Sequence, residues 1–594
     1  MMGVKLASIL TAILIILHGL TSVAAVFPEA VEAATSPRSN TTYYNPILPG
    51  FHPDPSCIFL REWDNTFFCA SSSFNAFPGI PLHASKDLRN WKLIGHALNR
   101  NEQLPRLAET NRSTSGIWAA TLRYHKGTFY VITTLVDDDR PPNDASRWDN
   151  IIFKSKDPYT LSAWSIATHF SFEGYDPDLF WDVGADGKEK TYVTGAHAWQ
   201  VDPGIWQAEA DLEKGTVGEL KLVWKGTGGT APEGPHIYKK DGWYYLLAAE
   251  GGTGLEHMVT ISRSKNIIGP FEQNPANPVL TNTNTTSYFQ TIGHSDLFQD
   301  RAGNWWAVAL STRGGPEYLH FPMVRETVLT PVTWKQGEWP VFSPIRGEMS
   351  GWDMGKEDRG IKGVGPFVDD ADDIDFAKLT RLPEHFTHWR YPIPSSYTLS
   401  PPSHPGTLRL TPSVLNLTAL TGNYAGPAGQ TFVGRRQSHT LFTYTVDLEF
   451  SGTVAEEEVG VSAFLTQNHH IDVGVVMLTG ADGALQPHLR YRAISYIPLP
   501  EPIVVPFPVE WKGYDTGKLA LEIRAVNASH YAFSAGPTGA RSLRRTIATV
   551  SNEGVSWGFT GVLLGVYSTT NGGAGSAPAY ISKWKYVPEG QFRD

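Results

Sequence analysis

Cysteine is almost absent from this chain of 594 residues, which contains only Cys57 and Cys69. Two cysteines cannot build a disulfide framework, and their spacing fits no zinc-ligand pattern, so disulfide-rich scaffolds and zinc modules are excluded. Both lie at about the same distance from a turn at 62–65, so a hairpin would place them opposite each other on adjacent strands. The sequence leaves a disulfide bond and a pair of buried free thiols as equal alternatives.

Clusters of positive charge are also missing. The formal net charge is −10 and the chain has no long run of Lys or Arg, so it lacks the electrostatic footprint of a protein that binds phosphate backbones. We therefore expect no nucleic-acid partner. Beyond the N-terminus no apolar run approaches the roughly 20 residues that a membrane-spanning helix needs, so we expect no membrane partner either.

The N-terminus has the pattern of a secretory signal. A lone Lys5 precedes an apolar run at 9–17, and small residues follow at 22–25. The sequence therefore predicts a signal peptide at 1–25, a spacer at 26–40 and a secreted, extracellular protein. A retained membrane anchor is the alternative, although the apolar run is short for one. Sequons for N-glycosylation, a tripeptide that also arises by chance, agree with a secreted glycoprotein and lie at Asn40, Asn111, Asn284, Asn416 and Asn527.

Length and composition favour two large all-β domains. A single core rarely exceeds about 250 to 300 residues, and 594 residues are well beyond that limit. Aromatic residues make up 12% of the chain, which also contains 56 Gly and 42 Pro. Such a composition favours short strands joined by many turns over helices.

A repeated unit fills the N-terminal half. Each copy has an apolar strand, a polar turn and an aromatic strand, and copies follow one another at roughly 60 residues, as four-stranded propeller blades do. The five copies begin at Pro55, Thr121, Leu179, His236 and Leu297. They predict a five-bladed β-propeller over 41–346.

The repeat stops after this region. Residues 347–373 are rich in Gly and Asp and are interpreted as a linker. Strands of alternating polarity at 443–450, 471–477 and 519–526, separated by Gly, Pro and Asn turns, then predict a β-sandwich over 374–594.

Aligning the copies on their first strand brings several functional side chains to one position, at the entrance of the strand that would line the central channel. These are Asp54, Trp118, Asp176, Glu233 and His294. Hydrolysis of a glycosidic bond needs one carboxylic acid and one carboxylate. The three carboxylates in this set, each flanked by Pro or Gly, are therefore candidate catalytic residues.

Simpler interpretations exist for each residue taken alone. Asp-Pro at a strand entrance is a common turn element. His294 would also suit a hydrogen-bonded position in the core, and Trp118 would suit packing between blades. The nearby Asp178, Asp182 and Asp296 are interpreted as turn or capping residues.

Five motifs at 45–56, 71–81, 85–91, 233–238 and 249–253 resemble signatures of glycoside hydrolase family 43, the β-xylosidases and α-L-arabinofuranosidases, in the order of that family. The resemblance implies an inverting mechanism in which Asp54 is the general base and Glu233 the general acid. Asp176 would position Glu233 and raise its pKa. The resemblance also implies a pocket for a single sugar lined by Phe74, Trp118, His294 and Arg325.

No cofactor is required by this resemblance, and no ligand spacing in the sequence demands a metal. In similar enzymes the residue matching His294 can lie near a calcium ion, so the resemblance allows a structural calcium. Motifs at 434–437 and 456–460 look like the concanavalin-like β-sandwich of exo-acting members, in which a sandwich loop closes the pocket. The sequence alone does not identify that loop.

The resemblance implies removal of terminal β-D-xylosyl or α-L-arabinofuranosyl units from xylan, arabinoxylan or their oligosaccharides in plant cell walls. The choice between the two sugars and the oligomeric state stay open. A non-catalytic carbohydrate-binding propeller is the main alternative, but such a protein would have no need for three carboxylates. A retaining fructosidase would carry an Asn-Asp-Pro-Asn-Gly pattern that is missing here, and an interaction propeller would show WD or kelch repeats.

Overall fold

The computed structural model describes residues 40–594 except 185, 199, 421–428 and 514–516. The predicted signal peptide and nearly all of the predicted spacer lie outside the described residues. Within them, regular structure consists of β-strands and short 3-10 helices, which confirms the expected all-β class. None of the described helices is long and apolar enough to cross a membrane.

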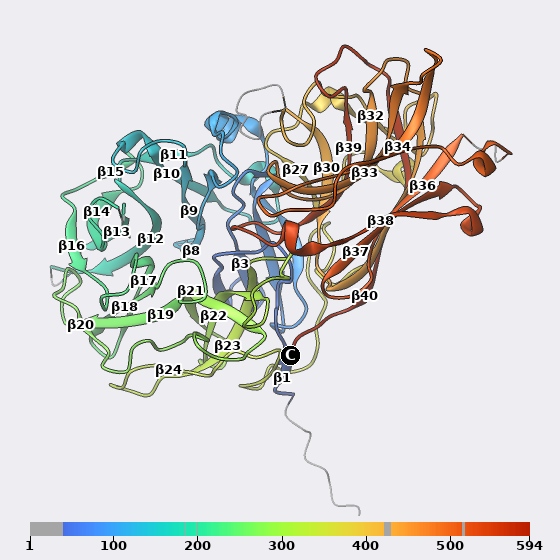
Figure 1. The fold of residues 1–594 in the computed structure, drawn as a ribbon. Helices are drawn as coiled ribbons and strands as arrows, with labels where there is room; N and C mark the ends of the chain where they lie inside the picture. Colours follow the sequence, from blue (N-terminus) through green and yellow to red (C-terminus); the bar gives the residue numbers. More distant parts are fainter. Residues whose placement is uncertain (1–39, 185, 199, 421–428, 514–516) are drawn as a thin grey trace, which may run out of the picture. The chain divides into compact units, whose positions relative to one another are not determined.

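Five antiparallel sheets follow one another along the chain around a common centre (Figure 1). They confirm the predicted five-bladed propeller. The first blade contains β2 (Ser56–Leu60), β3 (Thr66–Ala70), β5 (Gly79–Ser85) and β6 (Lys92–Leu98). The second contains β7 (Gly116–Ile117), β8 (Thr121–His125), β9 (Thr128–Val136), β10 (Trp148–Ser155) and β11 (Thr168–Phe170).

The other three blades have the same meander. The third contains β12 (Gly174–Val183), β13 (Glu189–His197), β14 (Ile205–Asp211), β15 (Thr216–Val217) and β16 (Lys221–Trp224). The fourth contains β17 (Glu233–Lys240), β18 (Trp243–Glu250), β19 (Met258–Ser264) and β20 (Glu272–Gln273). The fifth contains β21 (Phe289–Gln299), β22 (Trp305–Arg313), β23 (Glu326–Thr333) and β24 (Val341–Phe342).

The 3-10 helices occupy turns between strands. They are η1 (Asn101–Gln103), η2 (Pro105–Glu109), η3 (Ala145–Arg147), η4 (Leu161–Ala163), η5 (Phe376–Lys378), η6 (Pro394–Ser396), η7 (Val509–Gly513), η8 (Arg541–Leu543) and η9 (Asn552–Val555).

The inner strand of several blades contains an irregularity. In β12, β17 and β21 the register with the next strand shifts just before Asp178, His236 and Asp296. The backbone is left-handed two residues before each of these positions. It is also left-handed at Asp54, which lies two residues before the start of β2. Such a bulge turns side chains out of the ladder, here at the channel entrance.

This geometry corrects one detail of the repeat alignment. The left-handed residues are Asp54, Asp176, Gly234 and His294, with φ of 51°, 54°, 55° and 48°. Glu233 therefore lies one residue earlier than Asp54 and Asp176. Trp118 also lies one residue earlier, since it precedes the start of β8 by three residues rather than two. The five side chains still converge, but from two neighbouring positions.

Arg123 lies beneath this entrance and joins three blades. Its guanidinium donates to Asp178 and Asp296 at 2.8 Å each, and both carboxylates are fully buried. Burial alone would raise the pKa of Asp296, but the Arg123 charge holds it well below its ordinary value. The prediction that Asp178 and Asp296 are turn or capping residues is therefore wrong, and Asp182 instead pairs with Lys239.

Cys57 and Cys69 form a disulfide bond. They are directly opposite each other in the β2–β3 pair, as the hairpin expectation required, and both are buried. The structure thus decides between the two alternatives that the sequence left open.

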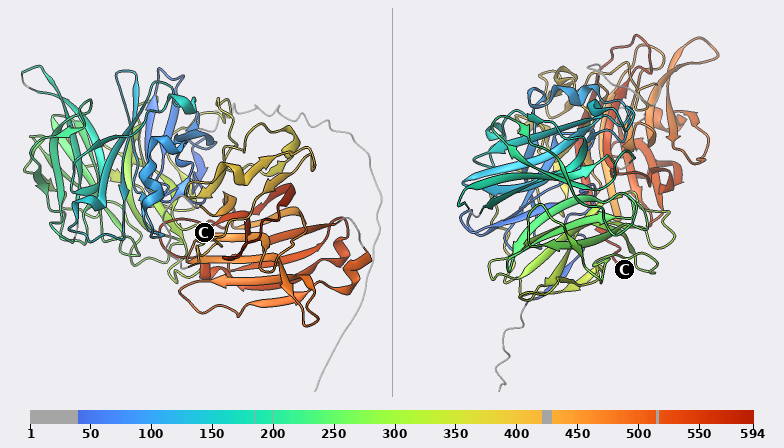
Figure 2. Two further views of the ribbon diagram at one scale, coloured as in Figure 1. Left: turned by 90° about the horizontal axis from the view of Figure 1, so that it is seen from above. Right: turned by 90° about the vertical axis from the view of Figure 1, so that its left-hand side faces the viewer.

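The C-terminal half is a sandwich of two antiparallel sheets, confirming the predicted architecture (Figure 2). One sheet contains β26 (Asp372–Ile374), β28 (Tyr397–Leu399), β29 (Leu408–Leu410), β31 (Leu441–Phe450), β36 (Lys518–Ala525), β37 (His530–Pro537), β38 (Arg545–Ser551) and β40 (Ala579–Gly590). The other contains β4 (Ala76–Phe77), β27 (Phe386–Trp389), β30 (Thr431–Arg436), β32 (Glu458–Thr466), β33 (His469–Thr479), β34 (Leu485–Ile494), β35 (Ile503–Pro506) and β39 (Leu563–Thr569).

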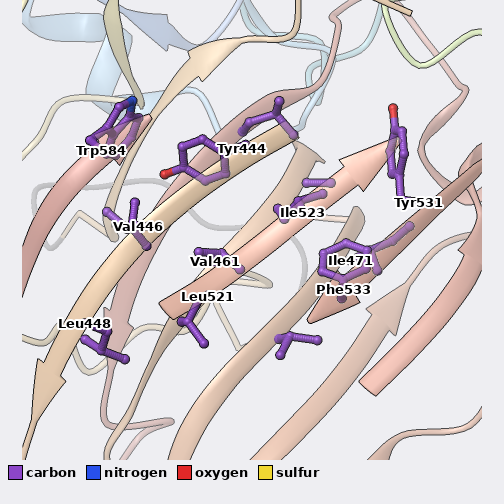
Figure 3. Close-up of a cluster of buried hydrophobic side chains, with 14 of the residues drawn as sticks. Tyr444, Val446, Leu448, Val461, Ile471, Leu521, Ile523, Tyr531, Phe533 and Trp584 are labelled. Atoms are coloured by element: carbon purple, nitrogen blue, oxygen red, sulfur yellow. The ribbon is translucent and has the colours of Figure 1, made fainter. Parts of the chain in front are cut away.

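The sandwich core forms because every second residue of each strand faces the opposite sheet. Tyr444, Val446 and Leu448 of β31 are buried in this way and meet Val461 and Ile471 of the second sheet (Figure 3). These positions carry the alternating pattern from which the strands were predicted.

The two domains share a sheet edge. Strand β4, which belongs to a loop of the first blade, pairs with β27 of the sandwich. The stretch predicted as a linker, 347–373, also carries strands at its ends: β25 (Glu348–Ser350) pairs with β1 (Thr42–Tyr44), and β26 joins the sandwich. Residues 40–594 therefore form one compact unit.

Gly50 marks a close contact between the domains. Its φ is +83°, and a Cβ atom at this position would lie 2.2 Å from the carbonyl oxygen of Gln437. Only glycine avoids both the backbone strain and this overlap. The segment that leads to Asp54 is thereby held directly against the sandwich.

Replacing Gly50 by Ala is expected to destabilise the protein strongly. The left-handed backbone alone should cost about 1–2 kcal/mol, and the overlap with Gln437 should cost at least as much again. Gly127 is the matched control, because its φ is +75° but no atom lies within 4 Å of a Cβ placed there. Denaturant unfolding should show a clearly larger loss for Gly50→Ala than for Gly127→Ala, and equal losses would contradict a close contact at Gly50.

Candidate active site

A cavity of about 320 Å³ opens at the channel entrance. This volume lies at the small end of the range of about 300–1,000 Å³ for ligand pockets. All seven predicted site residues line it: Asp54, Phe74, Trp118, Asp176, Glu233, His294 and Arg325. Side chains from all five blades thus meet in one cavity.

Asp54 is held by neighbours on both sides. The hydroxyl of Ser72 donates to its Oδ2 at 2.6 Å. Its Oδ1 faces Nη1 of Arg325 at 3.5 Å and Nδ1 of His294 at 3.8 Å. Asp54 is only 6% exposed, so this carboxylate is fixed in orientation and faces positive charge.

Glu233 is partly exposed, toward the pocket that it lines. The hydroxyl of Tyr175 donates to its Oε2 at 3.2 Å. Burial raises the pKa of Glu233 to about 7, and the charge of Asp54 adds to this effect, while Arg325 and the Tyr175 hydrogen bond oppose it. A carboxyl group with such a pKa can both carry and release a proton near neutral pH.

Asp176 lies beside Glu233 in the pocket. The backbone N–H of Gly234 donates to its Oδ2 at 3.1 Å, and Nδ1 of His294 is 4.0 Å from the same oxygen. Burial, and then the charges of Glu233 and Asp54, raise the pKa of Asp176 well above its ordinary value. Because adjacent carboxyl groups titrate as a pair, Asp176 and Glu233 together are expected to retain a proton near neutral pH.

Gly234 allows this packing. A Cβ atom there would lie 2.9 Å from Cε1 of His294, so the glycine lets the imidazole approach the backbone beside Glu233. Burial lowers the pKa of His294 to about 4, although the charge of Asp54 opposes the shift. His294 is therefore a neutral pocket residue at neutral pH, rather than only a packing element of the core.

Aromatic side chains form the wall of the pocket. Trp118 is oriented by a hydrogen bond from its Nε1 to the carbonyl of Thr114 at 2.9 Å and packs against Tyr175 with ring centroids 5.5 Å apart. Phe74 stacks with Phe559 at 5.6 Å. These rings offer flat apolar faces, which suit the face of a sugar ring.

Phe559 was not predicted, and it comes from the sandwich. It belongs to the segment between η9 and β39, lines the cavity and lies 4.3 Å beneath the guanidinium of Arg325. The sequence contains no signal for this residue, because it lies in a turn without a repeat or motif. It lines the cavity from the sandwich, the domain from which the family resemblance led us to expect a pocket-closing loop.

Glu250 organises another part of the wall. Its carboxylate is completely buried and accepts from the backbone N–H groups of Thr227 and Gly229 and from the hydroxyl of Thr260, at 2.8–3.0 Å. It thereby fixes the loop that leads to Thr230 and Ala231, which line the pocket. The 249–253 motif contained this residue, but the motif alone did not reveal its role.

No group of three or more His, Cys, Asp or Glu side chains among the described residues is arranged to hold a metal ion. His294 instead lies between the carboxylates of Asp54 and Asp176.

A larger cleft of about 760 Å³ lies elsewhere on the first and fifth blades. Among its lining residues are Asp64, Lys86, Asp300 and Arg301. It contains none of the seven predicted residues, so cavity size alone does not indicate the candidate site.

Comparison with known proteins agrees with this geometry. The family model described as "Glycosyl hydrolases family 43" matches residues 43–340. The chain belongs to glycosyl hydrolase family 43. It is a glycosidase, and residues 373–587 match the "Beta xylosidase C-terminal Concanavalin A-like domain".

Similar proteins cover nearly the whole chain. A non-reducing end alpha-L-arabinofuranosidase of Bacteroides ovatus is 35% identical over 551 residues, which cover 91% of this chain and 93% of the relative. A xylosidase/arabinosidase of Butyrivibrio fibrisolvens is 35% identical over 448 residues, covering 73% and 79%. The crystal structure of xylan beta-1,4-xylosidase from Bacillus halodurans C-125 superposes with a TM-score of 0.76 at 26% identity, covering 92% and 100%.

Replacing Glu250 by Gln is expected to loosen the wall of this family 43 pocket. An amide nitrogen would face backbone N–H donors, and each buried donor left unpaired costs about 1–3 kcal/mol. Hydrogen exchange at Thr227 and Gly229 should become faster and the melting temperature should fall. Glu256→Gln, at an exposed position, is the control; unchanged exchange in Glu250→Gln would disprove the role of this carboxylate.

Proposed function

We propose that this glycosidase is a secreted, exo-acting enzyme that removes terminal β-D-xylosyl or α-L-arabinofuranosyl units from xylan, arabinoxylan or their oligosaccharides. The observation that carries this proposal is one small cavity containing three carboxylates, of which Glu233 has a pKa near 7. Relatives named xylosidase and arabinosidase support the choice of pentose sugars.

Asp54 is proposed as the general base and Glu233 as the general acid. Asp54 faces Arg325 and accepts a hydrogen bond from Ser72, and these contacts hold its carboxylate in an orientation that suits the activation of water. Glu233 has the raised pKa that a proton donor needs. Asp176 and Glu233 would share one proton because two ionised carboxylates repel each other, and Asp176 would in this way raise the pKa of Glu233. Asp176 would also hold the Glu233–Gly234 backbone by accepting a hydrogen bond from the N–H of Gly234.

The proposed reaction is a single displacement. Water, deprotonated by Asp54, would attack the anomeric carbon while Glu233 gives its proton to the leaving oxygen, so that the configuration inverts. His294 and Arg325 would donate hydrogen bonds to the sugar hydroxyls, and Trp118, Phe74 and Phe559 would contact its apolar faces.

The size and the aromatic wall of the pocket support the exo mode, in which sugars are removed from a chain end. Phe559 from the sandwich and Phe74 from the first blade stack across one wall, and the cavity of about 320 Å³ is small. A pocket closed on one side admits a chain end more readily than the middle of a polysaccharide.

Substrates with leaving groups of different basicity can distinguish the role of Glu233 from that of Asp54. With xylobiose, both Asp54→Asn and Glu233→Gln should lower kcat by about 10²–10⁴-fold, the usual contribution of a general acid or base. With 4-nitrophenyl β-D-xylopyranoside or α-L-arabinofuranoside, Glu233→Gln should retain much more activity, since nitrophenolate leaves with little need for a proton. Asp54→Asn should stay inactive.

Asp202→Asn, at an exposed turn, is the control and should behave like the wild type. NMR of the first anomer released should show inversion, and a retained configuration would refute single displacement. Release of oligosaccharides rather than monosaccharides from arabinoxylan would refute the exo mode.

Replacing Tyr175 by Phe should change the pH dependence of activity. Because Glu233 must be protonated to act, activity should fall as the pH rises through about 7, the pKa of Glu233. The Tyr175 hydrogen bond lowers this pKa, so Tyr175→Phe should move the alkaline limb of kcat/KM to higher pH. Tyr130→Phe, outside the pocket, should leave the limb in place; a limb that moves to lower pH in Tyr175→Phe would contradict the assignment.

A further inference from the structure

Arg436 is a buried cation without a nearby anion. It is 8% exposed, and no carboxylate in the described part of the chain lies within ion-pair distance of its guanidinium. Its Nε donates to the carbonyl of Phe51 at 3.0 Å and its Nη1 to the hydroxyl of Thr387 at 3.2 Å, while its buried Nη2 has no partner. An uncompensated buried charge is costly, so something must balance it.

Arg435, the residue before Arg436, shows how a buried charge is ordinarily balanced. Arg435 is equally buried, but it pairs with Asp372 at 3.0 Å. Asp372 also contacts His385 at 3.1 Å, so its charge is already engaged. Arg436 therefore cannot rely on this carboxylate.

The neighbours of Arg436 add no negative charge. The buried imidazoles of His52 and His83 meet edge to face at 4.7 Å. Burial, with the charge of Arg436 as a further cause, lowers the pKa of His83 to about 3 and that of His52 well below its ordinary value. Both rings are neutral near pH 7, and Nδ1 of His83 has no hydrogen-bond partner.

These groups surround a small void between the propeller and the sandwich, which we call the interface cavity. Its volume is about 40 Å³, and its polar lining consists of His52, His83, His385, Arg435, Arg436 and Ser438. A void of roughly 10–15 Å³ on this scale already holds one water molecule. The interface cavity therefore has room for a monatomic ion but not for a ligand as large as a sugar.

We propose that the interface cavity binds a small inorganic monovalent anion, of which chloride is the simplest, against the guanidinium of Arg436. The anion would balance the Arg436 charge and accept hydrogen bonds from the unpaired Nη2 and from Nδ1 of His83. A cation is disfavoured because Arg435 and Arg436 both line the cavity.

Hydrogen bonds connect the proposed anion site to the segment that carries Asp54. Arg436 holds the carbonyl of Phe51, and the next residue, His52, bonds through its N–H to the carbonyl of Arg325 at 3.1 Å. Phe51 and His52 lead directly to Asp54. The anion would thus stabilise the contact that fixes the segment carrying one pocket carboxylate.

Bromide provides a direct test on the wild-type protein. Crystals grown with sodium bromide should show an anomalous peak in the interface cavity, beside Nη2 of Arg436. A peak-free cavity, or one that contains only water, would overturn the proposal whatever the variants do.

Solution measurements provide the second test. At constant ionic strength, replacing sodium gluconate by sodium chloride should raise the melting temperature saturably, by about 1–3 °C, because the ion binds only the folded state. Arg436→Gln should lose this chloride response. Arg524→Gln, at an exposed position, should keep it; a wild-type protein that melts at the same temperature in both salts would refute the proposal.

Discussion

The candidate active site depends on a left-handed backbone in the inner strands or just before them. A residue other than glycine in this conformation costs about 1–2 kcal/mol, yet Asp54, Asp176 and His294 all adopt it. The surrounding sheets impose this conformation, because the register of the following strand resumes two residues later. Strain at these positions turns side chains from separate blades out of their ladders and toward one cavity.

Three carboxylates in one pocket repel one another when they are ionised. Residues in the pocket and residues beneath it respond to this repulsion in different ways. In the pocket, Arg325 and His294 lie close to Asp54, while the Asp176 and Glu233 pair responds by a raised pKa. Beneath the pocket, the charge of Arg123 is matched by two buried carboxylates at 2.8 Å. Arg123 therefore joins three blades without neutralising the carboxylates above it.

The sequence was sufficient for features that repeat or that lie in continuous motifs. Five strand–turn–strand units predicted five blades, and alternating polarity predicted the sandwich strands, because both signals arise from local burial patterns. All seven site residues predicted from the repeat alignment and the family resemblance line one cavity. The one-residue offset of Glu233 was missed, since a bulge changes the register without changing the apolar pattern.

Residues that act through distant contacts could not be predicted in this way. Arg123 was missed because its partners, Asp178 and Asp296, belong to other blades and resemble turn residues in sequence. Phe559 was missed because it reaches the pocket only after the sandwich has packed on the first blade. Such residues have ordinary neighbours in the chain, and their function exists only in the folded arrangement.

The sandwich is therefore part of the site rather than an appendage to it. Phe559 completes the wall, Gln437 lies against Gly50, and Arg436 holds the Phe51 carbonyl. The last two contacts act on the same short segment that ends in Asp54. Any movement of the sandwich away from the propeller would remove an aromatic wall and release the support of a pocket carboxylate together, which explains why the interface is built from buried, closely fitted residues.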